Sequence, residues 1–316
     1  MTHDTFGPTS VVTGGTSAGL TELVARHRAL LIVGYLAAST VVFAGFGSVD
    51  RPALLWWLIG LVAFSCAGSE AGPRRVAMDW LPVLVIAAGY DTVRAQAPNL
   101  LSRAVVTPQL RFDELIFGGT APTVQLQRWL DVTTGEIHWW DYAVWVGYLS
   151  HFVVSLSIAA YLYVMDRVRF KRFATLILTV SVAGFVTYFI VPAAPPWLAS
   201  RQGALPHTTR IVYAVWAHLG LNGVAKVFNG SAQLANPVAA LPSLHAAWPL
   251  MVTLFLWPTA RRGRYLLVLY VAFMTFVLVY GAEHYVSDVA LGWLYTGVVF
   301  WGWNRYWARR ETVRRS

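Results

Sequence analysis

The stretch "ALPSLHAAWPLMVTLFLW", residues 240–257, decides the fold class. A Pro-Ser pair and a histidine, His245, stand directly before an apolar run that carries no charge. A second stretch, "YGAEHYVSDVALG" at residues 280–292, places His284 and Asp288 between two apolar runs. Ionisable groups beside long apolar runs are typical of membrane proteins in which polar residues line a cavity or a pathway.

The composition of the whole chain indicates the same class. Hydrophobic residues make up 57% of the 316 residues and charged residues only 12%, whereas a soluble domain is about 25% charged. The 15 Trp and 14 Tyr often stand near the ends of apolar runs, as in the aromatic belts of membrane proteins. We therefore predict an all-α fold, a polytopic helical membrane bundle, rather than a very apolar soluble protein.

The apolar runs predict eight transmembrane helices, since each crossing needs about 20 residues. The predicted spans cover residues 29–47, 53–69, 76–95, 142–165, 173–191, 242–257, 265–281 and 286–304. Most of the Lys and Arg residues fall in five clusters that this model places on one side. By the positive-inside rule this side is the cytoplasm. Both termini are then cytoplasmic, and the loops 96–141 and 192–241 are extracytoplasmic.

This topology sets the predicted organisation of the chain. Residues 1–25, rich in Thr, Gly and Ser, are predicted to form a disordered cytoplasmic tail and not a signal peptide. Residues 26–75 are predicted to hold two accessory transmembrane helices, and residues 76–310 to form a catalytic membrane domain of six transmembrane helices. The basic residues behind the net charge of +9 lie in short loops between apolar runs. We therefore expect an integral protein of the plasma membrane and no nucleic-acid partner.

The first extracytoplasmic loop contains "APTVQLQRWL", residues 121–130, whose apolar residues fall partly on one helical side. This pattern predicts a short helix. It either lies in the membrane interface or packs as an ordinary loop helix, and the sequence leaves both possibilities open.

The histidines and the aspartate form a plausible catalytic set at the extracytoplasmic ends of their spans. If the last span begins at "HYVSD", the i, i+4 spacing of His284 and Asp288 places both on one helix face. The carboxylate can accept a hydrogen bond from one ring nitrogen, which leaves the other nitrogen as a nucleophile. His245 can then act as a general acid. Together these groups could displace a leaving group from phosphorus.

The same residues carry a resemblance to a known family. "PSLH" (242–245) and "HYVSD" (284–288) resemble the second and third signature motifs of the type 2 phosphatidic acid phosphatase superfamily. "VPAAPPW" (191–197), "NPVAALPSLHAAWP" (236–249) and "YGAEHYVSD" (280–288) more closely resemble its inositolphosphotransferase branch, which includes the inositol phosphorylceramide synthases of fungi. The similarity runs from about residue 90 to residue 303.

The resemblance implies a six-helix catalytic core and a role for each residue of the set. His284 would attack phosphorus and form a phosphohistidine, Asp288 would orient it, and His245 would protonate the leaving oxygen. Ser243 would donate a hydrogen bond to the phosphoryl oxygens. The substrate would be a phospholipid or a polyprenyl phosphate, and the acceptor a lipid or a sugar hydroxyl.

Several positions depart from the phosphatase pattern. Leu244 stands where that pattern has Gly, and Leu278 and Val277 stand where it has a Ser-Arg pair. The first motif, Lys-x6-Arg-Pro, is not evident either. Because the phosphorane needs positive charge around its equatorial oxygens, other basic residues must supply it. The extracytoplasmic candidates are Arg51, Arg94, Arg103, Arg111, Arg128, Arg201, Arg210 and Lys226.

Among these candidates we predict that Arg94 and Arg201 bind the substrate. Arg94 ends an apolar span, where an unpaired charge is unfavourable. Asp91, one turn earlier, would aim Arg94 at phosphate or bind a sugar hydroxyl; a purely structural Asp91–Arg94 pair is the alternative. Arg201 follows the "PAAPPW" motif.

Two further ionisable residues lie near the predicted set. His151 lies about ten residues inside the span 142–165. We expect it to pack against a polar neighbour or, alternatively, to contact the site from behind. Glu283 is expected to be solvated or to pair with a loop arginine.

The sequence therefore predicts a membrane phosphotransferase that moves a phosphoryl headgroup, such as inositol phosphate, from a lipid to a hydroxyl acceptor. A lipid or polyprenyl phosphate phosphatase would use the same residues. A proton-coupled transporter with His284 and Asp288 as a relay, and an inactive scaffold, are alternatives of other classes. Two His and one Asp could bind zinc, but no thiol or third histidine is placed to complete the shell. We predict no metal and no cofactor.

Overall fold

The computed structural model describes residues 27, 30–38, 60, 72–132, 135–220 and 236–315. Within these ranges every regular element is a helix, as predicted. The predicted tail, 1–25, lies outside the described residues, as does most of the accessory segment 26–75 with its two spans. Residues 30–38 are helical and fall within the first of these spans.

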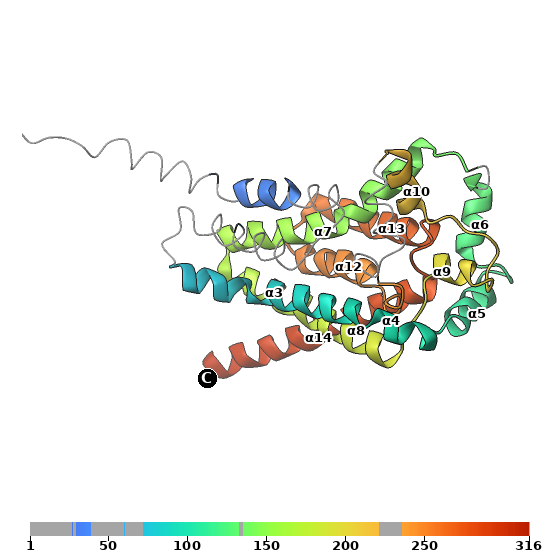
Figure 1. Ribbon diagram of the computed structural model, residues 1–316. Coiled ribbons are helices and arrows are strands. Elements are labelled where there is room, and N and C mark those ends of the chain that lie inside the picture. The colour runs from blue at the N-terminus through green and yellow to red at the C-terminus, as the bar shows by residue number, and fades with distance from the viewer. Residues whose placement is uncertain are drawn as a thin grey trace, which may run out of the picture.

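Six long helices run side by side and form the bundle (Figure 1). They are α3 (Pro73–Ala95), α7 (Trp139–Met165), α8 (Arg167–Ile190), α12 (Leu244–Leu256), α13 (Arg264–Tyr280) and α14 (Val286–Arg315). Five of them begin within three residues of a predicted span, α8 begins six residues before its span, and α14 continues to Arg315, well beyond residue 304.

Four segments of the described chain are long and apolar enough to cross a membrane. They are Arg74–Ala95, Trp139–Met165, Arg167–Ile190 and Arg261–Tyr280. The helix α12 has only 13 residues and so extends about 20 Å, less than the thickness of a hydrocarbon core. The total of eight crossings stays a prediction.

Local sequence signals explain where these helices begin. Pro73 opens α3, where the missing N–H of proline is harmless. A single residue, Asp166, separates α7 from α8, and its Oδ1 accepts hydrogen bonds from the N–H groups of Val168 and Arg169, both at 3.0 Å. This N-cap lets the chain reverse at once, so α7 and α8 pack against each other.

Shorter helices gather at one end of the bundle, opposite the C-terminus (Figure 1). They are α4 (Ala97–Leu100), the 3-10 helix η1 (Leu101–Arg103), α5 (Thr107–Ile116), α6 (Pro122–Trp129), α9 (Pro196–Arg201) and α10 (Ile211–His218). Isolated parallel bridges join Val105 to Ala193 and Ala193 to Ala239. These bridges hold three separate chain segments together at this end, which we call the loop end.

The helix predicted within residues 121–130 is present as α6. Its Val124 is buried while Trp129 is 71% exposed, so one face packs inward. Gln127 fixes it in place, since its Nε2 donates to the carbonyl oxygens of Thr209, at 2.7 Å, and Tyr280, at 2.8 Å. The loop end is thus tied to the end of α13. A position in the membrane interface stays a prediction.

The first turns of α12 and α14 lie in unusually close contact. The backbone N–H of Ser243 donates to the carbonyl oxygen of Asp288 at 2.9 Å. A Cβ atom added at Gly292 would lie only 2.3 Å from the carbonyl oxygen of Ser243. The approach of the two helices therefore requires glycine at position 292.

We expect Gly292→Ala to destabilise the protein by about 1–3 kcal/mol, because the new methyl group overpacks the contact with backbone atoms that cannot move aside. Gly302→Ala is the matched control on the same helix, since nothing lies within 4 Å of a Cβ there. It should be neutral or slightly stabilising, because alanine favours helix over glycine. Thermal unfolding in detergent checks both variants; equal midpoints would contradict the close contact.

Candidate active site

His245 is positioned by the start of α12. Ser243 is the N-cap of this helix, and its Oγ accepts a hydrogen bond from the N–H of Ala246 at 3.2 Å. The Tyr188 hydroxyl donates to the carbonyl oxygen of Pro242 at 2.8 Å. His245 therefore lies in the first turn of a helix whose start is held from two sides. Ser243 is fully buried as the cap, and its contact with a phosphoryl group stays a prediction.

His284 is oriented by a backbone carbonyl. Its Nδ1 lies 2.9 Å from the carbonyl oxygen of Ala240. A carbonyl oxygen can only accept, so Nδ1 carries the hydrogen and Nε2 keeps its lone pair. The ring is thereby held in the tautomer that a nucleophile attacking through Nε2 requires.

Asp288 is close to the His284 ring but does not accept this hydrogen bond. Its Oδ2 is 3.5 Å from His284 Nδ1, which is longer than a normal hydrogen bond, and accepts from the N–H of Tyr285 at 2.9 Å. The carboxylate lies next to the ring, but the expected shared helix face is not present, because α14 begins at Val286, after His284. The hydrogen-bond partner of Nδ1 is the carbonyl oxygen of Ala240. The carboxylate is fully buried, so its charge acts on the ring at short range.

The two predicted catalytic histidines face each other across the contact of α12 and α14. Their ring centroids are 5.9 Å apart. His245 also stacks on Tyr148, with centroids 4.7 Å apart and ring planes at 22°. The structure thus brings His245, His284 and Asp288 together at the loop end of the bundle.

His151, from the middle of α7, contacts the site from behind. Its ring lies 4.3 Å from that of His245 and 4.6 Å from that of Trp248, centroid to centroid. It is buried. His151 thus packs against a polar neighbour, and that neighbour is His245 of the candidate set.

A buried ion pair includes Glu283, the residue directly before His284. Arg210 Nε lies 2.7 Å from Glu283 Oε1, and Nη2 lies 2.9 Å from Oε2. The side chains are only 5% and 6% exposed. Burial opposes the positive charge, but the Glu283 carboxylate outweighs it and raises the pKa of Arg210. Glu283 thus pairs with a loop arginine, as one expectation had it, in a buried and not a solvated position.

The Arg210 side chain also reaches the aromatic residues of the site. Its Cζ lies 4.6 Å from the centroid of the Trp197 ring, within the range of a cation–π interaction. Arg210 lies within electrostatic reach of His245 and Tyr148. Arg210 is one of the eight candidate basic residues, but it was not among those predicted to bind the substrate, because nothing in the local sequence distinguishes it from the other loop arginines.

The predicted substrate-binding residues lie at different places. Arg94 forms an ion pair with Asp91 within α3, which fits the structural alternative and leaves a substrate contact as a prediction. Tyr90, one turn before Arg94, lies within electrostatic reach of both Arg94 and Arg210. Arg201 is exposed, and its Cζ lies 5.2 Å from the Trp197 centroid.

Asp113 supports the site and was missed by the sequence analysis. Its two carboxylate oxygens accept from the N–H groups of Val286 and Ser287, at 2.9 and 3.0 Å. It therefore caps α14 from α5, although it is far away in the sequence. Burial raises the pKa of the Asp113 carboxyl, and the two backbone hydrogen bonds act in the opposite direction. A lone Asp in a loop helix gives no sequence signal for this role.

Across the described part of the chain, no group of three or more His, Cys, Asp and Glu side chains is arranged to hold a metal ion. The chemistry that these residues can perform is transfer of a group through a histidine nitrogen, with a second histidine to move a proton.

The chain is similar to known synthases from bacteria and fungi. The chain is 30% identical over 233 residues to a phosphoinositol dihydroceramide synthase of Bacteroides thetaiotaomicron, covering 69% of this chain and 73% of that protein. It is 26% identical over 226 residues to an inositol phosphorylceramide synthase of Candida albicans, covering 70% of this chain and 46% of that protein.

A third relative is the inositol phosphorylceramide synthase catalytic subunit aur1 of Schizosaccharomyces pombe, 28% identical over 166 residues, with 48% of this chain and 37% of that protein covered. The chain thus spans less than half the length of the two fungal relatives. No solved structure matches the chain.

The model of the PAP2 superfamily matches residues 120–302, which is more than half of the chain and includes all three residues of the candidate set. The apolar helices and the membrane enzymes among its relatives show an integral membrane protein that handles lipid phosphates. The motifs around His245 and His284 indicated this family, and the family match and the relatives confirm it: the chain belongs to the PAP2 superfamily, in its inositolphosphotransferase branch.

Proposed function

We propose that this protein transfers phosphoinositol from a phospholipid to the primary hydroxyl of a ceramide-type lipid, through a phosphohistidine on His284. The observation that carries the proposal is the hydrogen bond from His284 Nδ1 to Ala240, which leaves Nε2 as a nucleophile next to His245. The choice of donor and acceptor is supported by the names of the relatives, which act on inositol phosphate and ceramide groups.

In the first step, His284 Nε2 attacks the donor phosphorus, and the bond from phosphorus to the glycerol oxygen breaks. Protonated His245 gives its proton to that oxygen, so diacylglycerol leaves and phosphoinositol stays on His284. In the second step, His245 takes the proton of the acceptor hydroxyl, whose oxygen attacks the phosphorus. The bond from phosphorus to nitrogen breaks, and both histidines return to their starting states.

Asp288 acts on the charge that develops during the first step. When Nε2 bonds to phosphorus, the imidazole ring becomes positively charged. A fully buried carboxylate with its Oδ2 3.5 Å from Nδ1 stabilises this charge, and the attraction is stronger there than it would be in water. The Ala240 carbonyl sets the tautomer, and Asp288 favours the charged intermediate.

Arg210 is the residue that we propose as the missing phosphate-binding cation. The phosphorane carries negative charge on its equatorial oxygens, and a fixed cation close to them lowers the barrier. Arg210 is buried, is held by the residue before His284 and lies within electrostatic reach of His245. Arg94, Asp91 and Arg201, which the sequence favoured, remain proposals for contacts with the donor headgroup.

We also propose that the site faces the extracytoplasmic side of the plasma membrane, with both termini in the cytoplasm. The arginines at the end of α14 lie at the opposite end of the bundle from the loop end (Figure 1). By the positive-inside rule, the arginine-rich end is cytoplasmic. The loop end, with the histidines, is then on the other face.

The first test of the proposed function uses purified protein in detergent, phosphatidylinositol labelled in the inositol ring, and ceramide. We expect labelled inositol phosphorylceramide, and a loss of at least about 10³-fold in His284→Gln, because the variant has no nucleophile. Label released as inositol phosphate without any acceptor would indicate a hydrolase instead. Turnover that survives in His284→Gln would exclude the phosphohistidine.

The proton transfer by His245 can be tested with a donor that needs no acid. In His245→Gln we expect transfer from phosphatidylinositol to fall by about 10²–10⁴-fold. In a 4-nitrophenyl ester of inositol phosphate the leaving group, nitrophenolate, needs no proton. The same variant should therefore still release nitrophenolate, in a burst that matches the amount of enzyme. Loss of this burst would show that His245 does more than move a proton.

The role of Arg210 is tested by Arg210→Lys and Arg210→Gln. We expect kcat to fall by about 10²–10³-fold in Arg210→Gln, because a fixed donor to the transition state is lost. Arg210→Lys should have a kcat little higher than that of Arg210→Gln, since lysine cannot pair with Glu283 through two parallel hydrogen bonds. Arg128→Gln, at an exposed arginine of α6, is the matched control. A change confined to the unfolding midpoint would leave Arg210 with a structural role only.

A further inference from the structure

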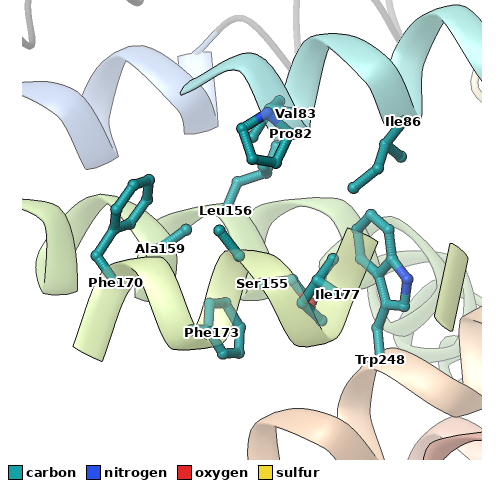
Figure 2. A pocket seen from close by; sticks show the side chains of 11 residues that line it. Pro82, Val83, Ile86, Ser155, Leu156, Ala159, Phe170, Phe173, Ile177 and Trp248 are labelled. Carbon is teal, nitrogen blue, oxygen red and sulfur yellow. The ribbon is translucent and has the colours of Figure 1, made fainter. Parts of the chain in front are cut away.

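An apolar pocket lies within the bundle, between α3, α7, α8 and α12 (Figure 2). Val83 and Ile86 of α3 form one wall, Phe173 of α8 forms another, and Ala159 of α7 and Trp248 of α12 also line it. Ser155 contributes a hydroxyl group to a lining that is otherwise hydrocarbon and aromatic, and the Trp248 indole N–H is donated to Ser181 at 3.1 Å. Such a lining favours a hydrocarbon occupant over water.

Two stacked side chains, Trp248 and His151, lie between the pocket and His245. Trp248 lines the pocket and stacks on His151, with ring centroids 4.6 Å apart, and His151 lies 4.3 Å from His245. Along α12, Trp248 is three residues beyond His245, which is a rise of about 4.5 Å. One residue that lines the pocket therefore lies less than one helical turn from His245.

The direction of the pocket follows the helices away from the loop end. Along α7, Ser155 lies about 6 Å and Ala159 about 12 Å beyond His151. Phe173, near the start of α8, belongs to the same far part of the bundle, because α7 and α8 are joined by a single residue. A chain that enters beside Trp248 would run along α7 toward the middle of the membrane.

We propose that this pocket binds one hydrocarbon chain of the lipid whose oxygen lies at His245. The inference rests on the proposed function and adds to it the site for the lipid chain. His245 meets the diacylglycerol oxygen in the first step and the ceramide oxygen in the second. The chains of the leaving lipid and of the acceptor therefore occupy the pocket in turn, which means that diacylglycerol competes with ceramide. Burial of successive methylenes then contributes to binding.

The kinetic test fills the pocket from α3. Val83→Phe places a larger side chain in the lining, whereas Val85→Phe makes the same change at a position that is 43% exposed. We expect Val83→Phe to lower kcat/KM for a long-chain ceramide by about tenfold and to spare a short-chain ceramide. Val85→Phe should have the same kcat/KM as the wild type for both ceramides. An equal loss for both ceramides in Val83→Phe would overturn the proposal.

A binding test without turnover separates the pocket from the proposed function. A ceramide with a diazirine midway along its acyl chain is photolysed with the His284→Gln variant, and labelled peptides are mapped. We expect label on the α3, α7 and α8 segments that line the pocket, reduced when Val83→Phe is added and unchanged with Val85→Phe.

The outcomes of the two tests are distinguishable. Label in the pocket without any headgroup transfer by the wild type would keep the chain site and reject the proposed reaction. Transfer to ceramide with label spread outside the pocket would keep the reaction and overturn the chain site. Label that excess phosphatidylcholine removes would show a site for bulk lipid only, and would also overturn the proposal.

Discussion

The contact between the first turns of α12 and α14 is the constraint on which the site depends. His245 lies in the first turn of α12 and His284 lies just before α14, so all of α13 separates the two histidines in the chain. The Ser243 N–H bonded to the Asp288 carbonyl at 2.9 Å locks one turn against the other, and the missing side chain of Gly292 lets the backbones approach. With α12 and α14 held there, the Ala240 carbonyl falls 2.9 Å from His284 Nδ1.

The loop end supplies a buried arginine and the hydrogen bonds that hold the ends of α13 and α14. A cation close to a phosphorane must be fixed and shielded from water to act strongly, but an unpaired arginine in such a place is unfavourable. The two-bond ion pair with Glu283 and the Trp197 ring offset that cost for Arg210. Asp113 and Gln127 use hydrogen bonds from the same loops to fix the ends of α14 and α13. The loops thus act as supports for the residues around His284.

The sequence predicted the features that depend on local pattern. Apolar runs located the six helices of the bundle, and two short motifs named the three residues that the structure brings together. Arg210, Asp113 and the partner of His284 Nδ1 could not be predicted in this way, because each depends on how long loops return to the bundle. Nothing near Arg210 differs from the other loop arginines, and a backbone carbonyl such as that of Ala240 has no signature in a sequence. The apolar run at residues 242–257 located α12, but its contact with Gly292 was not predicted.

The surroundings of His245 bear on the choice between transfer and hydrolysis. Its ring contacts those of Tyr148 and His151, and His151 in turn stacks on Trp248, which lines the apolar pocket. A base in such surroundings meets a hydroxyl that arrives with a hydrocarbon chain more readily than it meets water, because the chain gains from burial and water does not. The same three catalytic groups could serve either acceptor. On the proposed mechanism, a pocket that binds a hydrocarbon chain favours the lipid acceptor, and specificity for transfer then resides in α3, α7 and α8 and not in the catalytic set.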